Sequence, residues 1–335
     1  MKILTSGFIV ADMILAELPK IADPGHIVFA KKSVKLTVGG HPCNVSIDLI
    51  QLGLEKGSVG IVGAIGKDIF GSFIKSVLEE KGVVTHLLEL AEVGTTKNIA
   101  LVVKGEDRRF HLDLGASWHL DPGFVSKKIL EVKPRVFYAA SGLCGEFDER
   151  LGDVLETAKK TGSLTFVDMV EPYGRQWDYI VEHLDYADFF HCNDIELKNI
   201  FKTDSLASAM KAASERVNGV TFITLGEKGA IAVLKNGRYI RQKGFKVEVV
   251  DPTGAGDAFS AGIIFTLLKN GRLEAPSEIP LNDLKRLLMA GQAAGAACVT
   301  GVGTTTNVTR ENFDSLMNLQ GEEVLRSTEV LSLIP

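Results

Sequence analysis

The sequence has few cysteines and no long apolar run. Its four cysteines are scattered, without a C-x-x-C pair or a cluster with histidine, so neither a disulfide framework nor a zinc site is predicted. No stretch approaches the roughly 18 uncharged apolar residues that a membrane span requires, and Asp12 interrupts the apolar N-terminus too early for a secretory signal. These features predict a cytoplasmic protein whose cysteines stay reduced.

The chain also lacks an excess of charge of either sign. It has 37 Lys and Arg against 42 Asp and Glu, a net charge of −5, which gives no electrostatic basis for a nucleic-acid or membrane partner. Several well-known enzyme motifs are missing as well: the P-loop G-x-x-x-x-G-K-[ST], the dinucleotide loop G-x-G-x-x-G, the kinase triplet H-R-D and the zinc motif H-E-x-x-H. The better-known phosphate-binding loops are therefore excluded.

Glycine is the residue that the sequence has in excess. There are 34 glycines in 335 residues, about 10% against an average of about 7%. The remaining composition, with 45% hydrophobic and 24% charged residues, is that of an ordinary globular protein. The length suits two domains, or one large domain with an addition.

Helical and extended patterns alternate along most of the chain. Apolar residues at helical spacing predict helices at residues 42–52, 69–81, 148–160, 177–184 and 205–217. Short apolar runs predict strands at residues 2–10, 57–63, 136–140, 164–168, 188–191 and 221–225. This alternation predicts an α/β protein with a mainly parallel sheet that helices cover on both faces.

Two intervals break the alternation. Residues 12–38 and 93–117 contain strand patterns without helices between them. They are expected either to pair into one small antiparallel sheet beside the core or to form edge hairpins of the main sheet, and the spacing favours neither.

The segment from Asp251 to Gly262 carries the strongest chemical signal. An alternating strand ends at Asp251, the small residues Gly254-Ala255-Gly256 follow, and an apolar run of helix length continues the chain. A glycine-rich turn that enters a helix leaves backbone N–H groups pointing at one spot, which makes an anion-binding site. Asp257 lies in the first helical turn, and phosphoryl transfer to a hydroxyl needs a carboxylate beside such a site. The plainer interpretation is a tight turn with Asp257 as a cap.

Two long motifs resemble the signatures of one enzyme family. Asp251-Pro-Thr-Gly-Ala-Gly-Asp-Ala-Phe-Ser-Ala-Gly is similar to the C-terminal signature of the PfkB, or ribokinase-like, carbohydrate kinases. Gly39-Gly-His-Pro-Cys-Asn-Val-Ser, followed by Gly53 and Gly63, resembles their N-terminal signature. Because intermediate motifs fall in order between the two, the resemblance covers nearly the whole chain.

The resemblance implies catalytic roles for the turn before the helix. Asp257 would be the general base that takes the proton from the substrate hydroxyl. The backbone amides of Gly254, Ala255 and Gly256 would stabilise the charge of the transferred phosphoryl group.

Substrate contacts are implied at the N-terminal motif and in a lid strand. Gly39, Gly40 and Asn44 match positions that hold substrate hydroxyls. Asp12 matches an acidic residue that accepts hydrogen bonds from two of these hydroxyls. Arg109 lies in a segment that resembles the lid strand of sugar kinases, where it either binds an acidic sugar or remains a solvated charge.

Two further residues stand out. His41, with Pro42, occupies a position where many relatives carry small residues, which alters the pocket or simply starts a helix with proline. Asp168 lies at the carboxyl end of a predicted strand, where open α/β sheets place their ligands.

The resemblance implies ATP as phosphate donor, with Mg²⁺. Asn193-Asp-Ile-Glu196 resembles the N-x-x-E motif, in which Glu196 holds Mg²⁺ through water, and the same residues also suit an ordinary helix cap. The remaining matches are the nucleotide-loop residues Thr224, Gly226 and Gly229, the adenine-flanking Gln292, and Asp251 as a ligand for a monovalent cation such as K⁺.

The fold implied is a three-layer α/β/α ribokinase-like core of residues 1–11, 39–92 and 118–335, with a small β-sheet lid made from the two intervals. The expected activity is ATP-dependent phosphorylation of a hydroxyl, in particular a hydroxymethyl group, on a sugar or polyol. A nucleoside kinase of the same fold is the alternative. A non-catalytic nucleotide- or sugar-binding protein is less favoured, because it needs no base. An apolar lid face would favour a homodimer through the lid.

Overall fold

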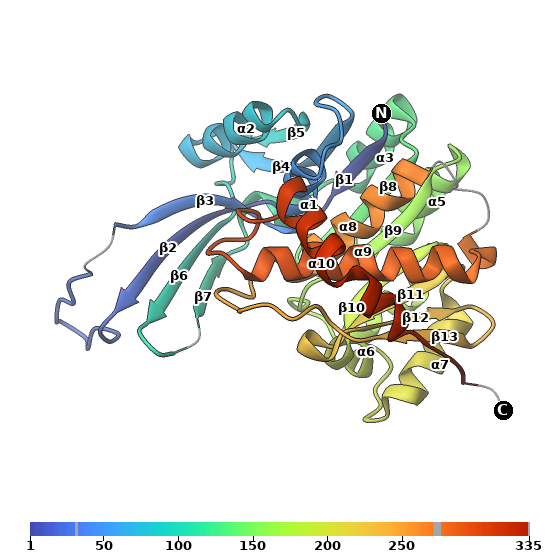
Figure 1. Cartoon of the computed structure of the whole chain (residues 1–335). Helices are drawn as coiled ribbons and strands as arrows, with labels where there is room; N and C mark the ends of the chain where they lie inside the picture. The colour runs from blue at the N-terminus through green and yellow to red at the C-terminus, as the bar shows by residue number, and fades with distance from the viewer. Residues whose placement is uncertain (31–32, 107, 271–275, 334–335) are drawn as a thin grey trace.

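The computed structural model of the chain describes residues 1–30, 33–106, 108–270 and 276–333. The predicted lid and core ranges each include a few positions outside these residues. The described chain forms a large layered body from which a second, smaller sheet projects (Figure 1).

The larger sheet builds the core. Its strands are β1 Ile3–Ser6, β4 Val59–Gly66, β5 Val84–Leu90, β8 Val136–Ser141, β9 Leu164–Met169, β10 Phe189–Asn193, β11 Val220–Thr224, β12 Ala230–Leu234, β13 Arg238–Gln242 and β14 Glu329–Ser332. They lie in the order β14-β13-β12-β11-β10-β9-β8-β1-β4-β5. In this spatial order, neighbouring strands pair in parallel along β11-β10-β9-β8-β1-β4-β5. The pairs β11–β12, β12–β13 and β13–β14 at the other edge are antiparallel. The predicted mainly parallel sheet is therefore confirmed.

Helices cover both faces of this sheet (Figure 1). One layer contains α1 His41–Gln51, α2 Ile69–Lys81, α8 Ala255–Asn270, α9 Leu281–Val299 and α10 Arg310–Arg326. The other contains α3 Pro122–Val132, α4 Glu146–Glu149, α5 Leu151–Lys160, the 3₁₀ helix η2 Trp177–Tyr186, α6 Asp194–Ile200 and α7 Leu206–Arg216. Three further 3₁₀ turns are η1 Gly115–His119, η3 Gly226–Lys228 and η4 Pro276–Glu278. These layers confirm the expected α/β/α architecture.

The strands meet both layers because successive side chains point to opposite faces. Tyr138 of β8 packs in the cluster that includes α8, whereas its neighbour Phe137 packs in the opposite cluster. On the α8 side, Tyr138, Phe166, Phe189 and Phe222 form a row across β8 to β11, with successive ring centroids 5.8, 5.9 and 6.2 Å apart. This aromatic row fixes the central strands beneath the functional site.

The smaller sheet is a lid drawn from both irregular intervals. Its strands, in spatial order, are β3 Lys35–Gly39, β2 Val10–Leu18, β6 Lys97–Val103 and β7 Arg109–Asp113. The β3–β2 and β6–β7 pairs are antiparallel, while β2 and β6 pair in parallel. The intervals therefore form a separate sheet rather than edge hairpins of the main sheet. The residue limits of the lid stay a prediction.

Several predicted elements differ from the structure in extent or type. The strand expected at residues 2–10 ends at Ser6, because the chain turns there and enters β2, the first lid strand. The helix expected at residues 177–184 is a 3₁₀ helix.

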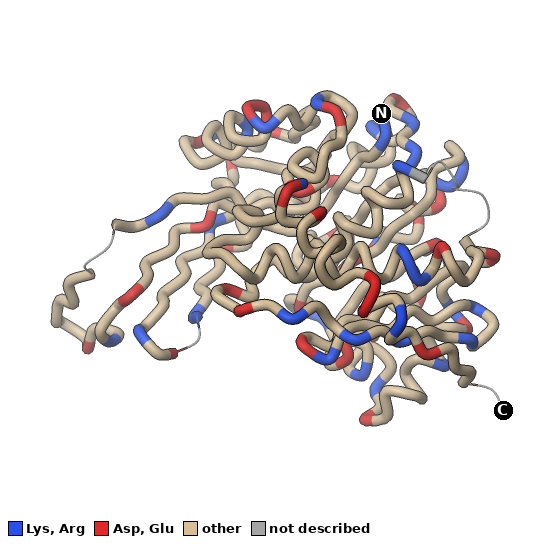
Figure 2. The backbone as a smooth tube through the Cα atoms, in the orientation of Figure 1, with Lys and Arg blue, Asp and Glu red and all other residues tan. Residues whose placement is uncertain are grey.

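Charged residues of both signs are spread over the described chain (Figure 2), and the cysteines lie inside it. Figure 2 shows basic and acidic residues interleaved over both the core and the lid. All four cysteines are buried and unpaired. Within the described ranges, no helix combines the length and apolar character needed to cross a membrane.

Candidate active site

A cavity of about 230 Å³ lies where β9, β10 and β11 end and α8 begins. The carboxyl ends of parallel strands are the usual place for a ligand in an open α/β sheet. The cavity is lined by His41, Asp168, Met169, His191, Asn193, Glu196, Thr224, Gly254, Gly256 and Asp257. The cavity thus brings together residues of both signature motifs, such as His41 and Asp257, with residues outside those motifs, such as Asp168 and His191.

The turn before α8 forms one wall. Gly254 has φ +82°, and a Cβ there would lie 2.7 Å from the carbonyl oxygen of Thr304, so only glycine fits. The first N–H groups of a helix have no acceptor within that helix and carry the positive end of its dipole. The N–H of Ala255 donates to the carbonyl of Pro252. The wall can therefore bind an anion chiefly through the amides on either side of Ala255.

Asp257 is the third residue of α8 and is 5% exposed. The Nδ2 of Asn44 donates to its Oδ2 at 2.7 Å, and Thr304 Oγ1 donates to the Oδ1 of Asn44, which orients that amide. Burial raises the pKa of the Asp257 carboxyl above its ordinary value; His41, Asn44 and His191 oppose the shift, while Asp168 adds to it. A carboxyl group whose pKa is raised in this way holds a proton more readily than an exposed one, which suits a general base.

Asp168 and His191 form a buried pair beside Asp257. Both continue the aromatic row toward the cavity, since each lies two residues beyond a phenylalanine on its strand. Asp168 Oδ2 lies 3.1 Å from His191 Nδ1 and accepts hydrogen bonds from Tyr138 and Ser260.

The protonation states of the pair follow from this contact. Burial favours the neutral forms, but the attraction between the partners outweighs it: the pKa of Asp168 is lowered and that of His191 is raised. The sequence singled out Asp168 by its place at a strand end and missed His191, which the same alternation of side chains would have revealed.

Asn193 and Glu196 form a reciprocal cap at the start of α6. Asn193 Oδ1 accepts from the N–H groups of Ile195 and Glu196, and Glu196 Oε2 accepts from the N–H of Asn193 at 2.7 Å. Both residues also line the cavity. Burial raises the pKa of Glu196, and the Asn193 N–H opposes the shift. The interpretation as a helix cap is therefore confirmed, and the role of Glu196 toward Mg²⁺ stays a prediction that the cap does not exclude.

A second polar cluster, Asp12 on β2 with Asn98 on β6, lies in the lid next to the core, a place called the lid base below. Asn98 Nδ2 donates to Asp12 Oδ1 at 2.7 Å, and burial raises the pKa of Asp12. A Cβ at Gly39 would lie 1.9 Å from Asp12 Oδ2, so the backbone of the N-terminal motif approaches this carboxylate closely. Gly40 is the N-cap of α1. Asn98 was not predicted, because no local pattern marks it.

Asp251 makes a contact that joins the lid to the core. Its carboxylate accepts hydrogen bonds from Thr253 and from the N–H of Gly303, and it pairs with Arg108 of the lid at 2.6 Å. Burial raises the pKa of Asp251, but these donors outweigh it and lower the pKa. The carboxylate does not fit a K⁺ site in this arrangement, because a guanidinium already supplies its positive partner. We assign no role to K⁺.

Some predicted residues lie apart from the cavity. Arg109 pairs with Glu106 within the lid and is nearly half exposed. Gln292 is buried in α9 and donates to Gln242. The residues Gly226 and Gly229 follow the cavity residue Thr224, but they do not line the cavity. Their assigned roles stay predictions.

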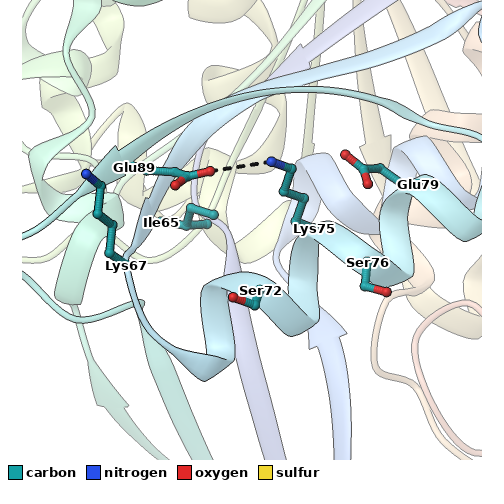
Figure 3. Close-up of a pocket in the computed structure, with 8 residues that line it drawn as sticks. Ile65, Lys67, Ser72, Lys75, Ser76, Glu79 and Glu89 are labelled. Atoms are coloured by element: carbon teal, nitrogen blue, oxygen red, sulfur yellow. Dashed lines mark hydrogen bonds and ion pairs between the residues drawn. The ribbon is translucent and has the colours of Figure 1, made fainter.

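A second hollow of about 250 Å³ lies between α2 and the ends of β4 and β5 (Figure 3). Lys75 Nζ and Glu89 Oε1 face each other across it at 3.5 Å. Both side chains are nearly half exposed, and no residue of either signature motif lines it. Residues of both signature motifs line the cavity beside α8 instead, which makes that cavity the candidate active site.

Comparison with known proteins identifies the family. The model for the pfkB family of carbohydrate kinases matches residues 3–311. The ribokinase of Haemophilus influenzae is 26% identical over 312 residues, which cover 90% of this chain and 93% of that protein. The structure of Arabidopsis thaliana ribokinase, complexed with ribose and ATP, superposes with a TM-score of 0.74 at 19% identity and covers 95% of this chain and 99% of that one. The nucleoside kinase of Methanocaldococcus jannaschii superposes with a TM-score of 0.71 at 21% identity and covers 95% and 98%. Because the family match spans nearly the whole chain, including both signature motifs, this protein belongs to the PfkB family of carbohydrate kinases.

Proposed function

We propose that this protein is an ATP-dependent kinase that phosphorylates a hydroxyl, in particular a hydroxymethyl group, of a sugar or polyol. The observation that carries the proposal is the buried Asp257 carboxylate, which shares one cavity wall with the anion-binding turn at Gly254 and Gly256. An acceptor hydroxyl at this carboxylate lies beside the place where phosphoryl charge is stabilised.

In this mechanism Asp257 takes the proton of the acceptor hydroxyl. The hydroxyl oxygen then forms a bond to the γ-phosphorus of ATP, and the bond from that phosphorus to the β–γ bridging oxygen breaks, with its electron pair leaving on ADP. Asn44 Nδ2 donates to Oδ2 of Asp257, and His41 Nδ1 lies 3.4 Å from Oδ1. Each carboxylate oxygen has two lone-pair sites, so a site remains for the proton of the hydroxyl. The amides at the start of α8 stabilise the negative charge of the phosphoryl group while it is transferred.

Glu196 is the residue that fits Mg²⁺. Only one of its oxygens is engaged with the Asn193 N–H, and Mg²⁺ prefers few carboxylates and keeps most of its waters. When bound, the ion neutralises phosphate charge. We propose that Asn193 and Thr224, on the same wall, contact the phosphates. Gly226, Gly229 and Gln292 retain their proposed nucleotide contacts.

We propose that the acceptor binds between the lid base and the start of α1. Asp12 and Asn98 offer acceptors and a donor there, and Gly39 allows close approach of the backbone. Such a set suits neighbouring hydroxyls on a sugar, a polyol or the ribose of a nucleoside. A nucleoside kinase is the second candidate, supported by the similarity to a nucleoside kinase structure.

A panel of acceptors tests the activity. Sugars, sugar acids, polyols and nucleosides are assayed with ATP and Mg²⁺ by ADP release, and each acceptor is ranked by kcat/KM. We expect the highest value for a sugar or polyol. A nucleoside at the top would favour the second candidate. Measurable ATP binding without ADP release for any acceptor would instead indicate a non-catalytic binding protein.

The role of Asp257 is tested by the substitution Asp257→Asn. Turnover is expected to fall by about 10³-fold or more, because the amide cannot accept the hydroxyl proton, while ATP binding stays nearly unchanged. The matched control is Asp153→Asn, since Asp153 is exposed on α5. If Asp257→Asn keeps substantial turnover, Asp257 is not the base.

Two further proposals concern the location of the enzyme in the cell and its oligomeric state. We propose a cytoplasmic location, supported by four cysteines that are buried and unpaired. We also propose a homodimer formed through the lid, supported by exposed apolar side chains on its strands.

A further inference from the structure

The cavity that would take the phosphates of ATP is lined by carboxylates. Asp168, Glu196 and Asp257 face it, and no Lys or Arg is among the described residues of its wall. Negative groups this close raise one another's pKa and repel phosphate. The cationic groups that the wall offers are the imidazoles of His41 and His191.

His191 is already engaged. Its Nδ1 lies within hydrogen-bond distance of Asp168 Oδ2 and Ser260 Oγ, and its ring stacks on Phe259 with centroids 4.9 Å apart. Its charge therefore balances Asp168. Asp257 needs a different counter-charge.

His41 stands where that counter-charge is needed. It is the first residue of α1, and its Nδ1 lies 3.4 Å from Asp257 Oδ1. A ring nitrogen of His41 and one carboxylate oxygen each of Asp168 and Asp257 lie within 4.8 Å of one another, so the imidazole lies beside two carboxylates. The Nδ1 atom is buried and makes no hydrogen bond to any described residue. A quarter of the side chain remains exposed at the cavity.

We infer that His41 is a positioning residue that acts through Asp257: its imidazolium holds the Asp257 carboxylate ionised and aimed at the acceptor hydroxyl. The inference rests on the proposed role of Asp257 as the base. Asn44, three residues further along α1, holds the other Asp257 oxygen. The first turn of α1 thus fixes the base from both sides.

The electrostatics of the neighbourhood agree with this geometry. Burial lowers the pKa of His41, and the charge of His191 on β10 adds to that effect. The negative charges of Asp257 on α8, Asp168 on β9 and Glu196 on α6 act in the opposite direction. These charges outweigh the other two effects, so the pKa of His41 is raised. Burial also raises the pKa of three other groups on which the charge of Asp257 acts, and so favours their neutral forms: Cys43, Asp48 and Tyr138.

A measurement without substrate tests the pairing. The protein is labelled with ¹³Cε1-histidine, and the signal of His41 among the seven histidines is assigned from its loss in His41→Gln. In Asp257→Asn the titration midpoint of His41 is expected to fall by about 1 pH unit, the effect of removing an opposite charge at this distance. Asp153→Asn is the control and leaves the midpoint in place. An unchanged midpoint in Asp257→Asn would overturn the inference.

Kinetics with the acceptor found in the panel give a second test. In His41→Gln the acidic limb of the kcat profile is expected to move to higher pH by about 1 unit, because Asp257 loses the charge that favours its ionised form. KM for ATP changes less than kcat at pH 6, and His41→Lys restores much of the loss. His119→Gln, at an exposed position, is the control.

The outcomes separate the two proposals. If Asp257→Asn remains active, Asp257 is not the base, and the proposed mechanism and the inference about His41 both fail. If Asp257→Asn is inactive but the pH profile of His41→Gln matches the wild type, His41 merely fills the start of α1, and only the inference is lost.

Discussion

Asp48 lies in the middle of α1 with a side chain fully removed from solvent. Neither of its carboxylate oxygens has a hydrogen-bond partner among the described residues. Burial raises the pKa of Asp48 well above its ordinary value, and the nearby charge of Asp257 adds to the shift. Burial therefore favours the protonated form of Asp48 in the folded protein, whereas water solvates the ionised carboxylate in the unfolded chain.

We expect Asp48→Asn to stabilise the protein at pH 7.5. The folded-state pKa of Asp48 is raised, so the wild type loses stability as pH climbs above the unfolded value of about 3.9. Asparagine is neutral in both states and escapes this loss. Thermal unfolding is expected to show a Tm about 2–4 °C higher or more at pH 7.5, the equivalent of about 1 kcal/mol, with the gap shrinking toward pH 4.

The control for this measurement is Asp204→Asn, at an exposed position before α7. It is expected to leave Tm unchanged at both pH values. A gap between Asp48→Asn and the wild type that does not depend on pH would mean that Asp48 is not buried in its neutral form.

At the residue scale, the sequence predicted the groups whose chemistry is fixed by local spacing. Asp257 follows its glycine turn directly, and Asn193 and Glu196 sit at cap spacing, so all three could be found from short motifs. Asn98 could not, because its partner Asp12 is 86 residues away in the chain. Such contacts depend on the pairing of distant strands, which no local pattern encodes.

At the scale of elements, Arg108 ties the lid to the core. The ion pair between Arg108 and Asp251 is largely buried, with 21% and 18% of the side chains exposed. The Arg108 guanidinium also lies 5.7 Å from the ring centroid of Phe110 on β7. Since Asp251 comes just before the glycine turn at the start of α8, the pair joins the lid to the segment that leads into the proposed phosphate site.

We expect Arg108→Gln to loosen the lid. A hydrogen bond to a charged partner contributes about 1.5 kcal/mol, so its loss should raise KM for the acceptor about 10-fold with a smaller effect on kcat. Hydrogen exchange of the amides in β2 and β6 should become faster in the same variant.

Lys104→Gln is the control, because Lys104 is an exposed cation of the same lid. It should change neither KM nor exchange. Equal exchange rates in Arg108→Gln and the wild type would show that the ion pair does not hold the lid.

Element boundaries were predicted best where caps are encoded locally. The helix α2 begins and ends as predicted, because Asp68 accepts from the N–H of Gly71 at the start and Gly82 adopts the left-handed conformation at the end. The helix predicted from residue 148 begins at Leu151, because a separate turn, α4, precedes it.

At the scale of the whole molecule, the length suggested two domains or one with an addition, and the fold is one layered core with a lid. The parallel pair of β2 and β6 makes the lid a single sheet, although β3, α1, β4, α2 and β5 all lie between these two strands in the chain. The sequence predicted the layers from their alternation. It left the lid undecided because pairing between distant strands carries no local signature.

The lid also exposes apolar side chains on both faces. By strand register, Phe110 and Leu112 share the face of Asp12 and Asn98, while Ile99 lies on the opposite face. Phe110 is 56% exposed, Leu112 40% and Ile99 45%. A monomer would leave these side chains in water, which a lid-to-lid contact would avoid.

We expect the wild type to elute as a dimer, with a mass by light scattering of about twice 36.2 kDa. Phe110→Asp places a charge in the proposed contact and should give a monomer, whereas Ile99→Asp on the opposite face should remain dimeric. Because Phe110 shares the face of Asp12, loss of the dimer should also raise KM for the acceptor. A wild-type mass of 36.2 kDa at every concentration would exclude the dimer, and dissociation by Ile99→Asp alone would place the contact on the other face of the lid.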